Sequence, residues 1–410
     1  MDLILRNARL SDAVPEAPLV DIGIESGRIA AIAPGLSADG PSRDLDGMLT
    51  CAGLIECHIH LDKARVFHRT APEPGRLADA VRRSSVVKHS FTVEDVHERA
   101  SRVLAAAIAK GTTRMRTQLE LDPIVDMRGF EGVQQAIKDF AHAIDVEICV
   151  FPEEGLTNNP GTDELLVAAL ESGIRVIGGA PSSDTNKLAQ LERVFELARH
   201  YDCDVDLHID FGNVPEDMDL ETVLRLTDRE KMGGRVAVAH LTKLTTHPLE
   251  QQRAIARRIA DAGVTVAVLP ATDLFLMGRD QTDNVRRGVV DANMLVDEGV
   301  NATIGTNNIV NGFTPFGDCS LVRLLNFYAH IVQVSTDAQL RQCWEMITTR
   351  AARMLNLKDY GLAVGKPADI VVFDAADPVE AIREIRQPLL AFKRGRQTLE
   401  WSKPKLFSQA

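Results

Sequence analysis

Residues 48–60 read MLTCAGLIECHIH, an apolar run that ends in two histidines. On a β-strand, side chains at positions i and i+2 lie on the same face, so the imidazoles of His58 and His60 can reach one metal ion while Ile59 faces the other way. Cys57 also has a metal-binding side chain, but it lies on the opposite strand face. The triplet predicts a metal site, although a histidine buried against the backbone is the alternative for either residue.

Two further histidines stand in the same kind of position. His208 ends the run DVDLH at residues 204–208, and His240 ends RVAVAH at residues 235–240. Apolar or alternating runs of this length are typical of β-strands. Three separate strands that each end in histidine strengthen the prediction of one shared metal centre.

Between residues 51 and 358, strand-length apolar runs alternate with amphipathic helical segments, a pattern that predicts a parallel sheet with crossover helices. The expected strands are 51–57, 112–119, 145–151, 174–178, 204–208, 235–240, 264–269 and 301–305, with helices such as 93–110, 187–200, 249–262 and 336–355 between them. Eight such units predict an α/β fold, a (β/α)₈ TIM-type barrel. Catalytic groups of this fold lie at the carboxyl ends of the strands, where the four histidines stand.

Both ends of the chain have a different texture, with short β-type runs separated by turns. The runs are residues 3–5, 21–24 and 28–32 near the amino end, and 368–373 and 389–396 near the carboxyl end. They predict a small β-sandwich-like domain built from residues 1–50 and 359–405, beside a barrel of residues 51–358.

The 410 residues carry a net charge of −12 and contain no Lys/Arg-rich run and no long apolar stretch. An acidic chain repels phosphate backbones and anionic lipids, so we expect a small-molecule partner and neither nucleic acid nor membrane. The amino end has no secretory signal pattern, and the six cysteines are scattered without a CxxC pair. The expected location is therefore the cytoplasm.

Five short motifs spread over nearly the whole chain resemble those of a known enzyme family. They are GLIECHIHLDK at residues 53–63, FPEEG at 151–155, VAH at 238–240, NLKDYG at 356–361 and GKPAD at 365–369. The family is the amidohydrolase superfamily and, within it, the cytosine deaminase-like branch. The resemblance implies that His58, His60 and His208 bind a metal, that His240 orients the attacking water, and that the chain forms a homo-oligomer.

The fourth strand bears on the number of metal ions. Dinuclear relatives need a lysine at the end of this strand, carbamylated to bridge two metals, and here the strand reads IRVIGG at residues 174–179. The resemblance therefore implies one divalent ion. Imidazole ligands favour Zn²⁺ or Fe²⁺, with Co²⁺ or Mn²⁺ as alternatives.

Two positions depart from the deaminase pattern. The proton-shuttling glutamate of the family, three residues after the fifth-strand histidine, is Phe211 here. The eighth-strand aspartate, which binds the metal and accepts a proton from water, is Asn307. An amide is a neutral, weaker ligand and cannot act as a general base. We therefore expect Asn307 as a fourth metal ligand, and other residues as proton carriers.

Several side chains near the expected barrel mouth are candidates for that role. The predicted catalytic residues are His240, Asp62, Glu153 and Asp273, with Asp210 and Glu120 as further carboxylates there. Each carboxylate has an alternative role in a solvated loop or as the partner of a metal-binding histidine. Glu153 is the most suggestive, because it replaces a glutamine that bonds the pyrimidine ring in cytosine deaminase. A carboxylate offers only acceptors, so the site is expected to favour a ring with N–H donors or a cationic amidine.

Eight side chains have the polarity or shape to orient a ring. The expected substrate-binding residues are Lys63, Gln118, Glu120, Glu153, Phe211, Arg279, Asn308 and Asn311. Lys63 and Arg279 could bind a substrate carboxylate, although a salt bridge at the barrel rim is the alternative for Lys63. The pair Gly178–Gly179 is interpreted as close packing, because no phosphate-binding glycine motif surrounds it.

These observations predict a metal-dependent hydrolase that adds water to an sp² carbon of a small nitrogen heterocycle and expels ammonia, an amine, a halide or sulfide. Loss of two proton carriers favours a leaving group better than ammonia, and a bound metal lowers the pKa of its water toward about 7. One alternative is a catalytically inactive metal-binding barrel that serves as a binding or scaffold protein, and another is hydantoinase-type ring opening. The base-flipping cytidine deaminases are excluded, because their HxE and PCxxC motifs are absent.

Overall fold

The structure, a computed structural model, describes residues 1–12, 14, 17–69, 76–404 and 406–407. Eight parallel strands pair in sequence order, and a parallel bridge between Ile59 and Asn307 joins the two outer strands. The strands are β6 (Leu54–Ile59), β7 (Thr112–Glu120), β8 (Asp145–Phe151), β9 (Val176–Gly179), β10 (Asp204–Ile209), β11 (Val236–His240), β12 (Thr265–Val268) and β13 (Asn301–Ile304). The bridge closes the sheet into a barrel, which confirms the predicted (β/α)₈ fold.

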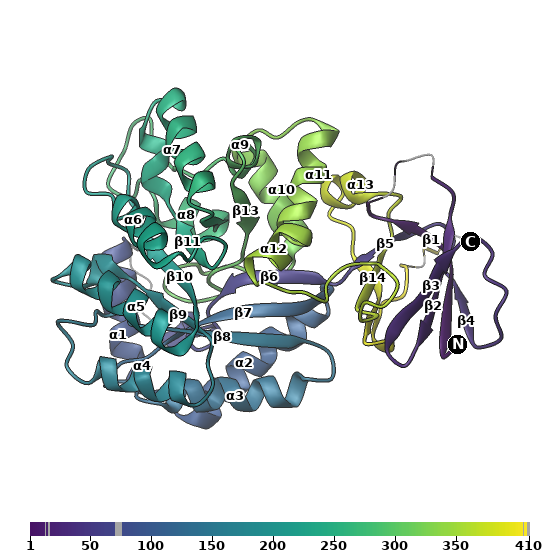
Figure 1. The fold of residues 1–410 in the computed structure, drawn as a ribbon, viewed down its shortest axis with the longest axis horizontal. Coiled ribbons are helices and arrows are strands. Elements are labelled where there is room, and N and C mark those ends of the chain that lie inside the picture. Colours follow the sequence, from purple (N-terminus) through teal and green to yellow (C-terminus); the bar gives the residue numbers. More distant parts are fainter. Residues whose placement is uncertain (13, 15–16, 70–75, 405, 408–410) are drawn as a thin grey trace.

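Helices follow the strands and surround the barrel (Figure 1). They are α1 (Leu77–Lys88), α2 (Val93–Ile108), α3 (Arg128–Phe140), α4 (Thr162–Glu171), α5 (Lys187–Tyr201), α6 (Leu220–Glu230), α7 (Leu249–Asp261), α8 (Pro270–Leu276), α9 (Ala292–Asp297), α10 (Leu321–Ile331), α11 (Asp337–Met346) and α12 (Thr349–Met354). Short 3₁₀ helices are η1 (Phe67–Arg69), η2 (Pro181–Ser183) and η3 (Thr242–Thr246). Within the described ranges, no helix is long and apolar enough to cross a lipid bilayer.

The helix predicted over residues 336–355 is wrong in its length, because two helices occupy this segment. Three β-branched residues in a row, at 347–349, lower the local helix propensity between α11 and α12. The hydroxyl of Thr348 donates to the carbonyl of Trp344 at 2.7 Å, and its backbone leaves the helical region with ψ of −101°. This break lets α12 turn separately toward the barrel.

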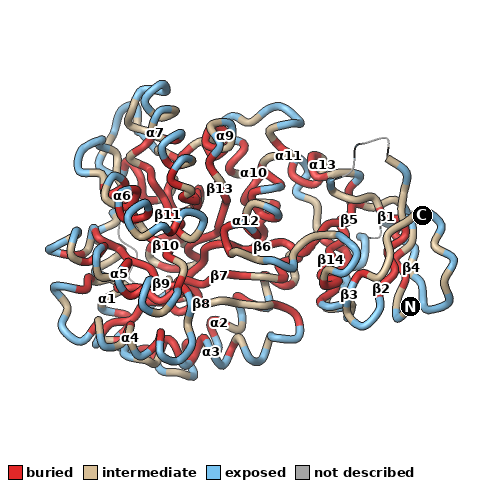
Figure 2. The backbone as a smooth tube through the Cα atoms, viewed as in Figure 1, coloured by how far each residue is buried: buried red, intermediate tan, exposed pale blue. Residues whose placement is uncertain are grey.

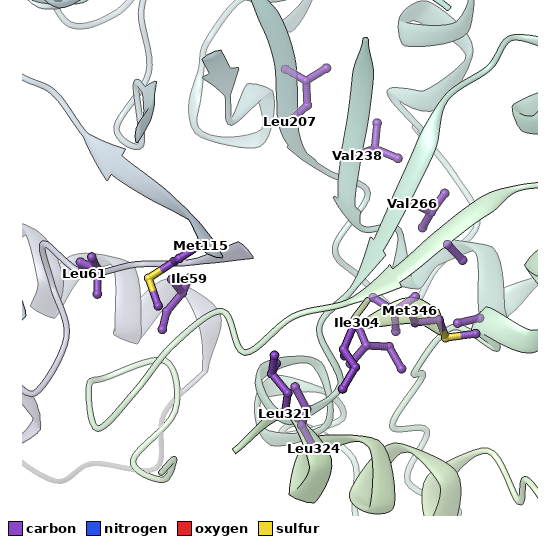
Figure 3. Packing of buried hydrophobic residues seen from close by; sticks show 14 of the residues in the cluster. Ile59, Leu61, Met115, Leu207, Val238, Val266, Ile304, Leu321, Leu324 and Met346 are labelled. Atoms are coloured by element: carbon purple, nitrogen blue, oxygen red, sulfur yellow. The ribbon is translucent and has the colours of Figure 1, made fainter. Parts of the chain in front are cut away.

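Apolar side chains between the strands and the helices form the main core. Figure 3 shows Leu207, Val238 and Val266 on the adjacent strands β10, β11 and β12. The strand register places Leu207 beside Val238 and Val238 beside Val266, and all three are fully buried. Figure 2 shows the same concentration of burial on the strands, with exposed backbone on the outer helices and loops. Each such side chain contributes about 1.5–3 kcal/mol by burial, which makes the barrel a rigid support for its loops.

A second sheet lies at one end of the molecule and combines residues from both ends of the chain (Figure 1). Its strands are β1 (Leu3–Leu10), β2 (Val20–Glu25), β3 (Arg28–Ala33), β4 (Ser42–Asp44), β5 (Leu49–Ala52), β14 (Ile370–Phe373), β15 (Pro388–Lys393) and β16 (Arg396–Glu400), with α13 (Pro378–Arg383) between β14 and β15. This arrangement confirms a separate terminal sheet. The domain limits predicted at residues 50 and 358 stay a prediction.

The strand predicted over residues 51–57 is divided between the two sheets. β5 pairs with β14 of the small sheet, whereas β6 pairs with β7 of the barrel. Gly53 separates them, and a Cβ at this position would lie 2.0 Å from Oγ1 of Thr113. Only glycine lets the chain pass so close to β7, so this residue fixes where the barrel begins.

Candidate active site

Three histidines meet at the carboxyl end of the barrel. His58 is in β6, His60 directly follows that strand, and His208 is in β10. The Nε2 atoms of His58 and His208 are 3.1 Å apart, and one nitrogen from each of the three rings lies within 4.8 Å of the other two. Burial lowers the pKa of all three imidazoles. The rings are therefore neutral at pH 7, with lone pairs available to a metal ion.

The donor set around these rings fits one divalent ion. Nδ1 of His60 and Oδ1 of Asn307 are buried without a hydrogen-bond partner among the described residues. Leaving a buried polar atom unpaired costs about 1–3 kcal/mol, whereas imidazole nitrogens and a neutral oxygen are suitable ligands for Zn²⁺ or Fe²⁺. Cys57 is not part of this set, because its thiol lies 3.4 Å from the hydroxyl of Thr303.

A polar layer on β7 and β10 supports His58 from behind. Nε2 of Gln118 lies 3.2 Å from Nδ1 of His58 and donates to Oδ2 of Asp206 at 3.0 Å. Arg116 donates to the same carboxylate oxygen at 3.1 Å. Asp206 and His208 share one face of β10. This strand therefore provides the histidine His208 and also the carboxylate that lies beside His58.

Asn307 lies where β13 meets β6. Its backbone N–H donates to the carbonyl of His58 at 2.8 Å, and the N–H of His60 donates to the carbonyl of Asn307 at 2.9 Å. The carboxylate of Glu56 accepts from the backbone N–H groups of His58 and Thr306, at 3.1 and 3.0 Å, and from the Thr306 hydroxyl. Burial outweighs these bonds and raises the pKa of Glu56 to about 7. This network fixes Asn307 beside the histidine cluster.

His240, at the end of β11, is oriented by a carboxylate. Its Nδ1 lies 2.6 Å from Oδ1 of Asp273 in α8, which is fully buried. A carboxylate accepts a hydrogen bond, so Nδ1 carries the proton and Nε2 is left for chemistry. The ring of Phe211 meets the His240 ring edge-on, with centroids 5.5 Å apart. Asp273 therefore positions His240.

A cavity adjoins the histidine cluster, and its lining has a polar side and an apolar side. Its polar lining is His60, Lys63, Glu153, Ser182, Ser183, His208, His240, Thr272, Asn307 and Asn308. Its apolar lining is Leu77, Val81, Ala180, Ile209, Phe211, Leu276 and Phe313. A pocket with an apolar wall and a few convergent polar groups is typical of small-molecule sites.

Lys63 and Glu153 form an ion pair in this cavity. Nζ of Lys63 donates to Oε2 of Glu153 at 2.7 Å and lies 3.4 Å from Oε2 of Glu120. Burial opposes the charge of Lys63, but the two carboxylates outweigh it and raise the pKa of this lysine. The pair thus presents a cationic donor beside an anionic acceptor.

Other predicted residues lie outside the cavity lining. Oδ2 of Asp62 accepts from the backbone N–H of Glu120 at 3.0 Å, and Nδ2 of Asn311 donates to Oδ1 of Asn308 at 2.7 Å. Gln118 lies behind His58, as described above. These side chains hold loops and metal-binding histidines in place, whereas the sequence predicted Asp62 as a catalytic residue and Gln118 and Asn311 as substrate-binding residues.

Two further candidates are directed elsewhere. The carboxylate of Asp210 accepts from the backbone N–H groups of residues 219 and 220, where α6 begins, and so acts as a helix cap. Arg279 lies 4.1 Å from the ring centroid of Phe275 and donates to the Phe275 carbonyl at 2.8 Å. Arg279 is not in the lining of the cavity beside the histidines, since the chain turns at Gly278 with φ of +64° and the guanidinium stacks on Phe275.

Apart from Phe211, the apolar wall of the cavity was not predicted from the sequence. Leu77 and Val81 come from α1, Leu276 from α8 and Phe313 from the loop after β13. The spacing of Leu77 and Val81 is a helical signal, but nothing local indicates that α1 packs over the histidines. Asp206 had a clearer signal, since it precedes His208 by two residues on a strand.

Comparisons with known proteins bear on the family and the fold of the chain. The amidohydrolase family model matches residues 75–398. N-isopropylammelide isopropyl amidohydrolase from Pseudomonas sp. (strain ADP) is 26% identical over 96% of each chain, and pterin deaminase from Rhizobium rhizogenes is 27% identical over 92% of this chain and 87% of its own. The structure of 5-methylcytosine deaminase from Klebsiella pneumoniae, liganded with 5-fluorocytosine, superposes with a TM-score of 0.93 at 27% identity over 99% of both chains.

Proposed function

The chain belongs to the amidohydrolase family and is a hydrolase of carbon–nitrogen bonds, and from this premise we propose that it releases an alkylamine from a nitrogen heterocycle that presents a lactam edge. The observation that carries the proposal is the ion pair between Lys63 and Glu153 in the cavity. An ammonium donor next to a carboxylate acceptor matches the adjacent C=O and N–H groups of a lactam.

The metal chemistry follows from the histidine cluster. His58, His60 and His208 would hold one divalent ion, with Oδ1 of Asn307 as a neutral oxygen beside it, and the bound ion would polarise the substrate and lower the pKa of a water toward about 7. An amide cannot take up the proton that this water loses. The proton acceptor must therefore be another residue of the cavity.

We assign that task to His240. With Nδ1 bonded to Asp273, its Nε2 accepts the proton from water and then delivers it to the departing nitrogen. The new bond is C–O and the broken bond is C–N, so the ring keeps the oxygen as a lactam and one proton of the water leaves on the amine. One histidine thus replaces both family proton carriers that the chain lacks at Phe211 and Asn307.

The apolar wall supports an alkylamine as the leaving group. Phe211, where deaminases have a charged proton shuttle, lies with Val81, Leu276 and Phe313 around the cavity. Burying an isopropyl group against such side chains is favourable by about 25 cal/mol per Å² of apolar area. Ammonia would leave this wall without a contact.

A panel of ring substrates tests the proposal. N-isopropylammelide, 5-methylcytosine, cytosine, pterin and hydantoin are each incubated with metal-loaded chain, and released amine, ammonia or ring-opened product is quantified by mass spectrometry. We expect the highest kcat/KM for N-isopropylammelide, at least tenfold above cytosine. Glu153→Gln replaces the carboxylate acceptor with an amide. This variant should lower the ratio of kcat/KM for N-isopropylammelide to kcat/KM for cytosine. Preference for cytosine, opening of hydantoin, or turnover of no member would contradict the proposed substrate class.

A further inference from the structure

A second buried lysine lies behind the cavity and is surrounded by carboxylates. Lys88, the last residue of α1, is 1% exposed. Its Nζ bonds to Oε1 of Glu120 at 2.6 Å and also contacts the carboxylates of Asp122 and Glu154. The three carboxylates have the geometry of a metal site, but the lysine ammonium is bonded to all of them. We therefore infer that the ammonium of Lys88, and not a second metal ion, occupies the space between these three carboxylates. We call the three carboxylates the cage.

Glu120 connects this cage to the cavity. Its two carboxylate oxygens have different partners, since Oε1 bonds to Lys88 at 2.6 Å and Oε2 lies 3.4 Å from Nζ of Lys63. Burial opposes both ammonium charges, yet the surrounding carboxylates outweigh it and raise the pKa of Lys63 and of Lys88. Glu120 is therefore shared between two cations, one of which lines the cavity.

Lys88 is also the end of the helix that covers the cavity. Leu77 and Val81 of α1 line the apolar wall, about three and about two helical turns from Lys88, respectively. Ala80 and Val81 of the same helix pack with Leu276 and Phe313. The lysine thus joins the apolar cover to carboxylates at the carboxyl ends of β7 and β8, and Glu153 of the cavity ion pair also follows β8.

We propose that Lys88 is a positioning residue for substrate binding: it fixes α1 over the cavity and, through Glu120, sets the position of Lys63 opposite the ring. This inference rests on the proposed function for its substrate. In the absence of Lys88, Glu120 has Lys63 as its only cationic contact among the described residues, so the ammonium shifts from Glu153 toward Glu120. The lactam edge then loses its donor.

The test compares variants of the full metal-loaded chain. Lys88→Met keeps the aliphatic stem and removes the charge, and Glu120→Gln removes the shared carboxylate. Glu154→Gln is the matched control, because this carboxylate contacts Lys88 but does not contact Lys63. For each variant, kcat and KM are measured on the best substrate of the panel, and hydrogen exchange is measured over residues 77–88.

Lys88→Met should raise KM at least tenfold with kcat changed less than threefold, and should speed amide exchange in α1 at least tenfold. Glu120→Gln should also raise KM, and adding Lys88→Met to it should raise KM by a smaller factor than Lys88→Met does in the parent, because only the contribution through α1 remains. Glu154→Gln should leave KM within threefold. Unchanged KM and exchange in Lys88→Met, or equal KM effects of Glu120→Gln and Glu154→Gln, would overturn the assignment.

Two outcomes separate this inference from the proposed function. If no ring is turned over but Lys88→Met still loosens α1 while Glu154→Gln does not, the proposed substrate is wrong and the contribution of Lys88 to the cover stands. If Lys88→Met does not fold, the comparison of Glu120→Gln with Glu154→Gln decides the inference alone. Each of these two variants removes one carboxylate from the cage and retains the lysine.

Discussion

Asn307→Asp should lower the stability of the metal-free protein and raise its affinity for metal. The side chain of Asn307 is 1% exposed, and its Oδ1 has no partner among the described residues. A carboxylate placed there would be buried beside the neutral rings of the histidine cluster, so burial disfavours its charge. Protonation limits this cost at pH 7 to about 4 kcal/mol, since one pKa unit corresponds to about 1.4 kcal/mol and the pKa can rise by about three units.

A bound divalent ion removes this penalty, because it supplies the missing positive charge. The free-energy cost of burying the carboxylate is present only in the metal-free state, so binding of the ion relieves it and becomes more favourable by the same amount. With a cost of about 3 kcal/mol, the dissociation constant should fall on the order of 100-fold.

Urea unfolding of the metal-free and Zn²⁺-loaded forms measures the two stabilities, and competition with a chelator measures the affinity. We expect Asn307→Asp to be about 3 kcal/mol less stable than the parent without Zn²⁺ and at least as stable with it. Asn308→Asp is the matched control, because Oδ1 of Asn308 already accepts from Asn311 at 2.7 Å. Its affinity should change less than tenfold. Equal Zn²⁺ affinity and equal metal-free stability in the parent and Asn307→Asp would refute the placement of Asn307 at the ion.

Three further predictions concern other parts of the molecule. His240→Ala should lower kcat by about 10²–10⁴-fold while elemental analysis still finds one metal per chain, because the histidine carries a proton and is not among the three clustered ligands. Gly178→Ala should lower the free energy of unfolding by about 1–3 kcal/mol in urea titrations, because a Cβ there would lie 2.5 Å from the carbonyl oxygen of Asp206. Gly312→Ala is the control and should leave the free energy of unfolding unchanged, because no atom lies closer than 3.8 Å to a Cβ at that position. Burial raises the pKa of Asp184, but hydrogen bonds from Thr157 and nearby backbone N–H groups outweigh it and lower that pKa to about 2. Its stabilisation is therefore present above pH 3.8 and lost as the pH falls through about 2, so Asp184→Asn should cost about 1 kcal/mol at pH 7, after allowance for solvent screening, and nothing well below pH 2.

The sequence was sufficient for the barrel and for the histidine cluster because both depend on short-range patterns. His58, His60 and His208 each stand at a strand end, and parallel strands bring their carboxyl ends to one side of a sheet. The same pattern does not show where one sheet stops and the next starts. The division at Gly53 depends on contact with Thr113, sixty residues later in the chain.

The rest of the cavity depends on long-range packing that no local pattern records. Lys88 meets Glu120 because α1 folds back over the barrel, and the sequence between them has no motif that indicates the contact. Arg279 was predicted to face the substrate on the strength of its charge alone, yet its guanidinium stacks on Phe275. Asp210 was proposed as a catalytic carboxylate, but its two hydrogen bonds to α6 reflect a helix-capping role that its spacing does not indicate.

The most direct test of the account is metal content measured together with hydrolysis. The chain is purified without a chelating tag, stripped with a chelator and titrated with Zn²⁺ or Fe²⁺, and amine release from N-isopropylammelide is recorded at each step beside the same titration of His208→Ala. The account predicts that activity rises in proportion to bound metal up to about one equivalent, and that His208→Ala neither retains metal nor turns over substrate. Full activity in the metal-free chain, or in His208→Ala, would contradict it.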